Sequence, residues 1–259
     1  MRKVKGMKNT WAVVTGGSSG LGVAFAERLA AEGADVWLAA RSQDKLRDVA
    51  DRISGEFGVA TRISVVDLSD DEARAAFMAE LRDARVSHLV NNAGFAQIGS
   101  FADSDPERTT EMLELNVVAL TDLIHAVLPG MHERGRGAII NVASTGAFQP
   151  TPSMAAYAAS KAYVLNLSAA LWQELKGTGI RVLASCPGPT ETDFWTVAGN
   201  DSVLKNRRTP QQVVDATMDG LRRNRPVVID GAWNKALAFA ARFAPVQAQT
   251  AVSHYVTTR

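Results

Sequence analysis

The chain has 259 residues, of which 46% are apolar, so it can bury one large core. Its 28 Lys and Arg nearly balance its 27 Asp and Glu, and the net charge of +1 excludes a general affinity for nucleic acid or anionic membrane; any basic site must be local. The single cysteine and four scattered histidines exclude an internal disulfide and predict no metal site, which fits a cytoplasmic protein.

Short apolar runs rich in β-branched residues alternate with longer amphipathic segments, as in a parallel sheet whose strands are joined by helices. The predicted strands cover residues 11–15, 35–40, 61–66, 88–91, 138–142, 180–185 and 226–229. The predicted helices cover residues 21–32, 43–57, 70–85, 106–133, 153–177 and 210–222. The pattern predicts a single α/β domain over residues 1–259, with a doubly wound sheet of about seven parallel strands and helices on both faces. Residues 188–206 and the tail after Gly231 show no clear element.

No segment predicts an export signal or an integral membrane span. The basic residues 1–8 precede an apolar run that is too short for a signal, and no later run approaches the roughly 20 apolar residues of a span. The most apolar late segment, 236–246, contains Arg242 and Pro245, which indicates a packing or interface segment.

A glycine-rich turn joins the first predicted strand to the first predicted helix. Glycines at such a turn let a pyrophosphate approach backbone N–H groups at the positive end of a helix. A P-loop would need Lys and Ser or Thr where this chain has Val23 and Ala24. The TGxxxGxG spacing of residues 15–22 instead resembles the short-chain dehydrogenase/reductase family. The turn residues are Gly16, Ser18, Ser19, Gly20, Leu21 and Gly22.

Tyr157 and Lys161 are four residues apart in a predicted helix, so they share one face. An ammonium beside a phenol lowers the pKa of that phenol from about 10 and makes it a usable acid and base. Ser144 follows the fifth predicted strand, at the sheet edge where such folds bind ligands, and its hydroxyl can hold a substrate oxygen. The spacing of these three residues, together with the Asn-Asn-Ala-Gly sequence at 91–94, also resembles the same family.

The resemblance covers about residues 10–229 and implies a Rossmann-like fold that interconverts a carbonyl and a secondary alcohol with a nicotinamide cofactor. It implies that Tyr157 protonates the carbonyl oxygen, that Ser144 positions this oxygen, and that Lys161 also holds the nicotinamide ribose. In the family an asparagine that matches Asn116 connects the lysine to a water relay. The other cofactor contacts that the resemblance implies are Asp67, Leu68, Asn91, Ala93, Gly94, Pro187, Gly188, Thr190 and Thr192.

The residue after the second predicted strand indicates which nicotinamide cofactor the chain prefers. NAD-dependent folds place an acid there to accept from the ribose, whereas this chain has Arg41, whose guanidinium can pair with a 2′-phosphate. The sequence therefore favours NADP(H), with NAD(H) as the alternative.

Substrate selection is assigned to a variable lid over residues 189–208 and a variable tail over 231–259. The pocket candidates are mostly apolar, which favours a ketone, a steroid-like or terpenoid-like carbonyl, or a 3-oxoacyl group. They are Phe95, Thr145, Phe148, Met154, Phe194 and Trp195. The tail has three possible roles: to cover the active site, to join a neighbouring subunit or to rest on lipid.

The helices over 106–133 and 153–177 carry more apolar residues than one sheet face requires. Relatives pair these helices between subunits, so we expect a homodimer or homotetramer. Two other functions stay open. One is a catalytically silent NADP(H)-binding sensor or scaffold, and the other is an enzyme resembling nucleotide-sugar epimerases, against which the chain length and glycine spacing argue.

Overall fold

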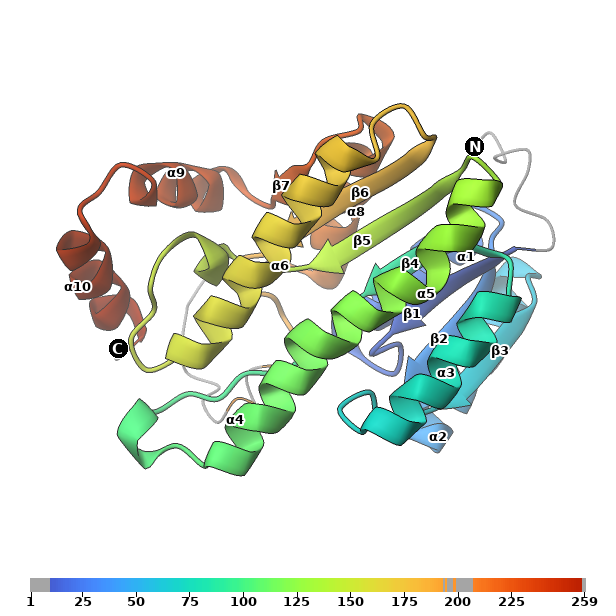
Figure 1. Cartoon of the computed structure of the whole chain (residues 1–259), viewed down its shortest axis with the longest axis horizontal. Coiled ribbons are helices and arrows are strands. Elements are labelled where there is room, and N and C mark those ends of the chain that lie inside the picture. The colour runs from blue at the N-terminus through green and yellow to red at the C-terminus, as the bar shows by residue number, and fades with distance from the viewer. Residues whose placement is uncertain (1–9, 193, 195–197, 199–206, 258–259) are drawn as a thin grey trace.

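The computed structural model describes residues 10–192, 194, 198 and 207–257. Within them, seven parallel strands form one sheet in the order β3-β2-β1-β4-β5-β6-β7 (Figure 1). The strands are β1 (Trp11–Thr15), β2 (Asp35–Ala40), β3 (Thr61–Val65), β4 (Val86–Asn91), β5 (Gly137–Val142), β6 (Ile180–Cys186) and β7 (Val227–Ile229). All seven predicted strands are confirmed to within two residues at each end.

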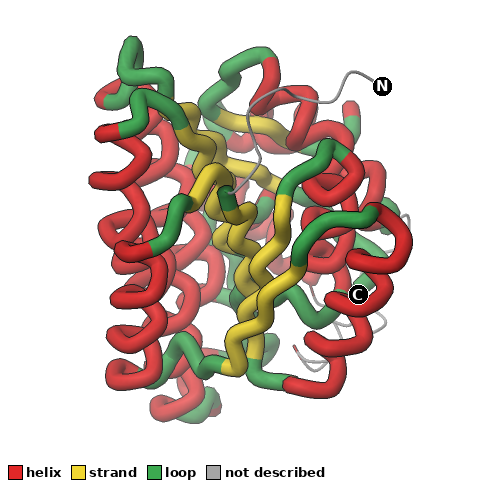
Figure 2. Tube along the Cα trace, turned by 90° about the vertical axis from the view of Figure 1, so that its right-hand side faces the viewer, coloured by secondary structure: helices red, strands yellow, loops and turns green. Residues whose placement is uncertain are grey.

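Helices cover both faces of the sheet, so the Rossmann-like, doubly wound fold is confirmed (Figure 2). One face carries α1 (Gly20–Ala31), α2 (Gln43–Phe57) and α8 (Pro210–Arg222), and the other carries α3 (Asp71–Asp83), α5 (Leu120–Glu133) and α6 (Ala155–Glu174). Shorter elements are η1 (Phe101–Asp103), α4 (Pro106–Leu113), η2 (Glu114–Ala119) and η3 (Thr145–Phe148). The strand order changes direction between β1 and β4, and folds of this kind bind ligands at that point.

The core has two halves, one on each side of the sheet. Successive side chains of a strand point to opposite faces, so Trp37 packs with Phe77 on one side while Leu38 packs with Phe25 on the other. Both faces are therefore buried, which explains why the strand sequences are uniformly apolar instead of alternating.

The helix Pro106–Glu133 is long and apolar enough to cross a membrane, which the sequence reading did not anticipate. However, 44% of its most apolar 18-residue stretch is buried in the fold. Met112, Leu123 and Met131 are buried within the globular fold. Core helices of globular proteins have the same length and composition, so this helix alone does not argue for a membrane span.

The tail, for which the sequence predicted no element, forms the helices α9 (Ala232–Ala241) and α10 (Val246–Thr257). Figure 1 shows this pair projecting from one end of the molecule, beyond the sheet. We call residues 232–257 the C-terminal hairpin. Most of the predicted lid at 189–208 lies outside the described residues.

Candidate active site

A cavity of about 980 Å³ opens at the carboxyl ends of the strands. Its walls come from the loops after β1, β2, β3, β4, β5 and β6, together with α6 and the C-terminal hairpin. Most of the residues predicted to bind a cofactor line it. They are Gly16, Ser18, Ser19, Gly20, Leu21, Arg41, Asp67, Leu68, Ala93, Gly94, Tyr157, Lys161, Pro187, Gly188, Thr190 and Thr192.

The glycine turn has a backbone that side chains would disturb. Gly16 and Gly20 have φ of 63° and 51°, in the left-handed region that favours glycine. A Cβ on Gly22 would lie 2.1 Å from the carbonyl oxygen of Gly16, so Gly22 shapes the turn although it does not line the cavity. The turn thus leaves an uncovered backbone cradle at the start of α1, which fits a dinucleotide pyrophosphate.

Two polar side chains fix this turn, and the sequence reading gave neither of them this role. The Asn92 side-chain amide donates to the carbonyl oxygens of Thr15 at 3.0 Å and Gly16 at 3.3 Å. The Thr15 hydroxyl accepts from the N–H groups of Asn92 and Ala93, both at 3.0 Å. The ends of β1 and β4 are therefore tied together where the cradle begins.

The three predicted catalytic side chains meet at the inner end of the cavity. Ser144 caps η3, and its Oγ accepts from the N–H of Gly146 at 3.1 Å. Tyr157 and Lys161 are buried on the first two turns of α6. The Lys161 ammonium lies 5.8 Å from the centre of the Tyr157 ring and donates to the carbonyl oxygen of Val142 at 2.8 Å.

Burial governs the proton affinities of this group. It raises the pKa of Tyr157 to about 12, against a smaller lowering by the hydrogen bond with Ser144. It lowers the pKa of Lys161 to about 8. The structure does not show the expected lowering of the phenol pKa by the ammonium: burial raises this pKa, and the lowering cause is the hydrogen bond with Ser144. At neutral pH the phenol is protonated, which is the form that can donate a proton.

Asn116 is buried in η2, a π-helical turn within the long helix. Its side chain accepts from the N–H of Phe95 at 3.2 Å and donates to the carbonyl oxygen of Phe95 at 3.0 Å and to Ser160 at 3.2 Å. It does not line the cavity, so in the structure it holds the loop after β4 against α6. Gly94 makes this approach possible, since a Cβ there would lie 2.6 Å from the Asn116 oxygen.

Asn91 also lies beneath the cavity without lining it. Its amide donates to the Asn141 oxygen at 2.9 Å and so joins β4 to β5. The Asn91 oxygen is buried without a hydrogen-bond partner among the described residues. The predicted bond across the sheet is therefore present, while direct cofactor contact by Asn91 stays a prediction.

The outer end of the cavity is polar. Arg41 is exposed and lies 3.6 Å from the Asp67 carboxylate and 3.5 Å from that of Glu111. Lys45, on the first turn of α2, lines the same end, and the sequence reading did not single it out. Two cations beside a helix N-terminus fit a phosphate group.

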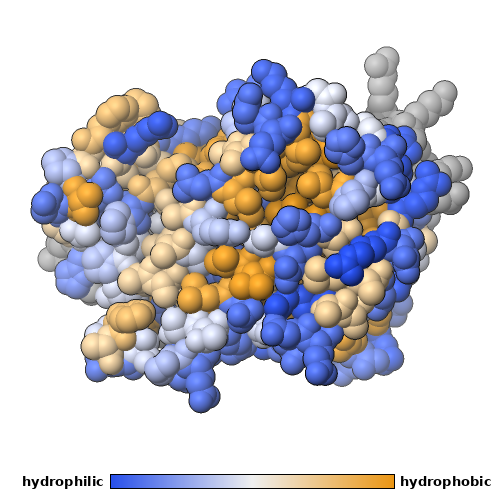
Figure 3. Space-filling view, viewed as in Figure 1, coloured by the Kyte–Doolittle hydropathy of each residue, from blue (hydrophilic) through white to orange (hydrophobic). Residues whose placement is uncertain are grey.

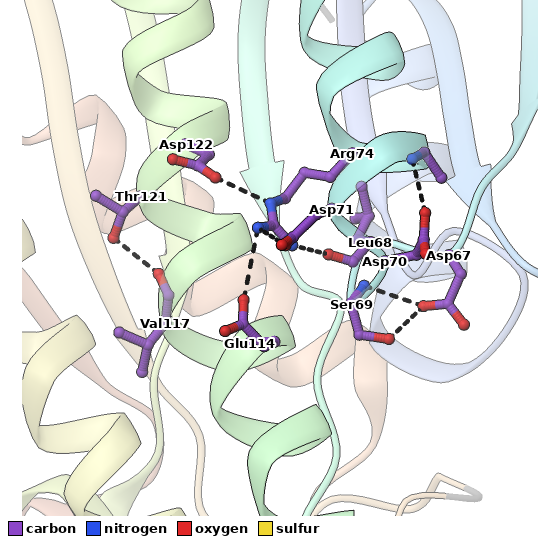
Figure 4. A network of polar contacts seen from close by, with 11 residues as sticks. Asp67, Leu68, Ser69, Asp70, Asp71, Arg74, Glu114, Val117, Thr121 and Asp122 are labelled. Atoms are coloured by element: carbon purple, nitrogen blue, oxygen red, sulfur yellow. Dashed lines mark hydrogen bonds and ion pairs between the residues drawn. The ribbon is translucent and has the colours of Figure 1, made fainter. Parts of the chain in front are cut away.

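Arg74 joins the wall of this outer end to the long helix (Figure 4). Its buried guanidinium donates to the carbonyl oxygen of Leu68 at 3.0 Å and to Asp122 at 2.9 Å. It also pairs with Asp71 at 2.5 Å and Glu114 at 3.5 Å. One side chain thereby fixes the loop that carries Asp67 and Leu68 relative to η2.

The inner end is mainly apolar. Of the predicted substrate residues, Phe95, Thr145, Met154 and Phe194 line it, and the Phe194 ring lies 5.7 Å from that of Tyr157. Phe148 packs against the core and does not line the cavity, while Trp195 lies outside the described residues. The tail at 231–259, to which the sequence assigned substrate selection without naming residues, supplies part of the wall through the C-terminal hairpin. Those residues are Trp233, Asn234, Leu237, Ala238, Ala240, Ala241, Ala244, Ala248, Gln249, Val252 and Ser253.

The family model described as short chain dehydrogenase matches residues 10–202. The chain is 38% identical over 180 residues to human "Inactive hydroxysteroid dehydrogenase-like protein 1", aligning 68% of this chain with 54% of that protein. It is 36% identical over 181 residues to the very-long-chain 3-oxoacyl-CoA reductase of Rattus norvegicus, aligning 68% of this chain with 58% of that protein. The chain thus spans little more than half the length of these relatives.

Solved structures match over most of the chain. The structure of a short-chain dehydrogenase from Sphingobium yanoikuyae in complex with NADPH has a TM-score of 0.83 and 39% identity, covering 89% of this chain and 93% of that one.

Proposed function

The chain belongs to the short-chain dehydrogenase/reductase family, and from this premise we propose that it is an NADP(H)-dependent oxidoreductase that interconverts a mainly apolar ketone and a secondary alcohol. One observation carries the proposal: Ser144, Tyr157 and Lys161 line the same cavity as the glycine turn. A relative is named inactive, so catalysis itself is part of what we propose.

The cofactor would lie along the sheet edge, with its pyrophosphate on the glycine turn and its nicotinamide end near Tyr157, Lys161 and Thr192. When bound, NADPH supplies the hydride. The walls around this end of the cavity include Gly94, Pro187, Gly188, Pro189, Thr190 and Thr192, and Lys161 stands where it can hold the ribose.

The side chains of the chain supply the rest of the chemistry. The Tyr157 hydroxyl holds a proton at neutral pH because burial raises its pKa to about 12, so in reduction it donates to the substrate oxygen. Ser144 holds that oxygen through its own hydroxyl. Lys161 carries its charge below about pH 8, where it favours the tyrosinate left after proton transfer.

The preference for NADP(H) rests on Arg41 and Lys45. Both line the outer end of the cavity, and no acid follows β2 at the position where NAD-dependent folds have one. A 2′-phosphate would compete for Arg41 with the carboxylates of Asp67 and Glu111, which lie 3.6 and 3.5 Å from its guanidinium. Arg41→Ala should therefore reduce the ratio of NADPH to NADH affinity, and an unchanged ratio would remove Arg41 from the proposal.

The substrate class follows from the inner wall of the cavity. Phe95, Met154, Phe194 and the hairpin residues present carbon to the ligand, and no acidic side chain lines this end among the described residues. Such a wall favours steroid-like, terpenoid-like or 3-oxoacyl carbonyls over sugars. The names of the two relatives contain hydroxysteroid dehydrogenase and 3-oxoacyl-CoA reductase, which supports the same classes.

The test is NADPH oxidation, followed by absorbance, on a panel of cyclic ketones, steroid ketones and 3-oxoacyl thioesters. We expect turnover of at least one member and a loss of at least about a hundredfold in Tyr157→Phe, since general acid catalysis contributes about that much. Tyr163→Phe is the matched control, because Tyr163 lies on the same helix but bonds Thr121 at 3.0 Å, away from the cavity. Equal turnover by Tyr157→Phe and the wild type would refute the mechanism.

The same experiment separates the second candidate function. A catalytically silent sensor would bind NADPH, detected by the change in its fluorescence, without oxidising it on any member of the panel. The complete set of Ser144, Tyr157, Lys161 and Asn116 favours the enzyme.

We also propose a cytoplasmic homodimer or homotetramer that pairs helices 106–133 and 153–177. Leu113 and Tyr163 on these helices are exposed, and Leu165 and Leu171 are only partly buried. Figure 3 shows apolar side chains along this face. Sedimentation velocity tests the pairing: Leu113→Glu should shift the chain toward the monomer, and a monomeric wild type would refute it.

A further inference from the structure

The C-terminal hairpin exposes an unusual amount of apolar surface. Trp233, Phe239 and Phe243 are 72%, 68% and 71% exposed, and Val246 and Val252 are exposed as well. The rings of Phe239, near the end of α9, and Phe243, in the turn that follows this helix, lie 5.0 Å apart. Isolated apolar side chains are common on surfaces, but a cluster of aromatic ones on one projecting element marks an interaction site. Figure 1 shows how this element projects.

The charge of the tail differs from that of the rest of the chain. All 27 acidic residues precede Gly231, whereas three of the 28 Lys and Arg follow it, namely Lys235, Arg242 and Arg259. The tail therefore carries a net charge of +3, and the remaining chain carries −2. Basic and aromatic residues together, without acids, are the composition of helices that lie on anionic lipid.

The hairpin is also continuous with the cavity. Trp233, Leu237 and Val252 are exposed and at the same time line the cavity. The apolar surface thus extends from the outside of the hairpin to the inner wall near Tyr157. A ligand that moved from a lipid layer beside the hairpin into the cavity would contact apolar side chains along the whole route.

We propose that the C-terminal hairpin docks on an anionic lipid surface and receives apolar substrate from it. The docking stands on the hairpin alone, while the delivery of substrate rests on the function proposed above. A second copy of the chain is the other occupant that such a surface could take. A two-fold contact between two hairpins would gather the Lys235 and Arg242 of both copies in one interface with no acid on either tail to compensate, which disfavours it.

The docking is tested with the full chain and two kinds of vesicle, one of phosphatidylcholine alone and one with about a third phosphatidylglycerol. We expect co-flotation with the anionic vesicles. A Phe239→Ser/Phe243→Ser double variant should bind at least roughly tenfold more weakly, because it removes two exposed rings that would enter the lipid. Neither residue lines the cavity.

Two further variants sharpen the test. Phe101→Ser is the matched control, because Phe101 is also 68% exposed but lies on η1, and it should bind as the wild type does. Lys235→Gln/Arg242→Gln should lose roughly fivefold in binding for each removed cation, on the anionic vesicles only.

The outcomes separate the alternatives. The proposal is overturned if the wild type does not float with anionic vesicles, or if Phe101→Ser weakens binding as much as the double variant. A double variant that dissociates an oligomer in sedimentation, with vesicle binding unchanged, would assign the surface to a second copy instead.

Delivery of substrate needs its own measurement, with one ketone dissolved in water and one embedded in the vesicles. The double variant should reduce the dissolved ketone at the wild-type rate and the embedded ketone several-fold more slowly. If the wild type reduced neither ketone while still floating with vesicles, the proposed function would fail and the docking would stand.

Discussion

Replacing Lys161 by methionine separates the catalytic value of this side chain from its cost to the fold. Burial holds the pKa of Lys161 at about 8 instead of 10.5, so the unfolded chain binds the proton more tightly than the folded chain. The free energy of unfolding therefore rises with pH between these two values. At about 1.4 kcal/mol for each tenfold change in proton affinity, the charged amine costs the fold about 3 kcal/mol at neutral pH.

Methionine has a similar length and no charge, but it cannot donate to the Val142 carbonyl oxygen as Lys161 does at 2.8 Å. Losing a hydrogen bond from a charged donor costs about 1.5–3 kcal/mol, so the two effects nearly cancel near neutral pH. We expect Lys161→Met to be inactive and yet within about 2 kcal/mol of the wild type in stability. From about pH 7 to about pH 9.5 the wild type should gain about 2 kcal/mol over the variant.

The assay is urea unfolding followed by tryptophan fluorescence at both pH values, without nucleotide. Tyr157 and Cys186 have raised pKa values, so each lowers the stability as the pH rises above its ordinary value, but both are present in the two proteins and largely cancel in the difference. A stability difference that stayed constant with pH, or that moved toward the variant at high pH, would refute the claim that the buried amine is charged at a cost.

Three other substitutions test the architecture of the site. Gly22→Ala places a Cβ 2.1 Å from the Gly16 carbonyl oxygen, so it should raise the Kd for NADPH at least roughly tenfold, measured by fluorescence titration; an unchanged Kd would show that the cradle is not the pyrophosphate site. Arg74→Met should lower the free energy of unfolding by about 2 kcal/mol in urea, because it leaves partly buried carboxylates and a carbonyl oxygen without their partner. An unchanged free energy of unfolding would show that the contacts in Figure 4 do not stabilise the fold. Asn116→Ala removes two hydrogen bonds to the Phe95 backbone, so it should lower the stability by about 1–3 kcal/mol in thermal unfolding and reduce kcat. An unchanged stability would show that Asn116 does not hold the loop after β4 in place.

The sequence was most informative where the chemistry is local. Each strand is a short β-branched run that is buried on both sides, so its composition reveals it without alternation. Tyr157 and Lys161 share a helix face by spacing, and Ser144 follows a strand, so the fold brings the three side chains to one sheet edge. These relations need no knowledge of the other parts of the chain.

The errors and omissions concern long-range effects. The direction of the pKa change at Tyr157 depends on desolvation by distant segments, and residue spacing carries no information about it. The π-helical turn at Asn116 and the links from Asn92 to the glycine turn likewise arise from tertiary packing. Phe148 lies in η3 and its side chain packs against the core. The sequence places Phe148 after the fifth strand but does not show in which direction its side chain points, so its prediction as a pocket residue was wrong.

The C-terminal hairpin lines the cavity but lies far along the chain from the glycine turn and from Ser144, Tyr157 and Lys161. The family match ends at residue 202, whereas the hairpin begins at 232 and still forms part of the cavity wall. If the proposed function holds, we expect mutations in these last residues to change which ligand the cavity accepts while the strands, the glycine turn and Tyr157 stay unchanged. Natural variation and directed evolution therefore have a region in which new selectivities can arise while the inherited chemistry stays intact.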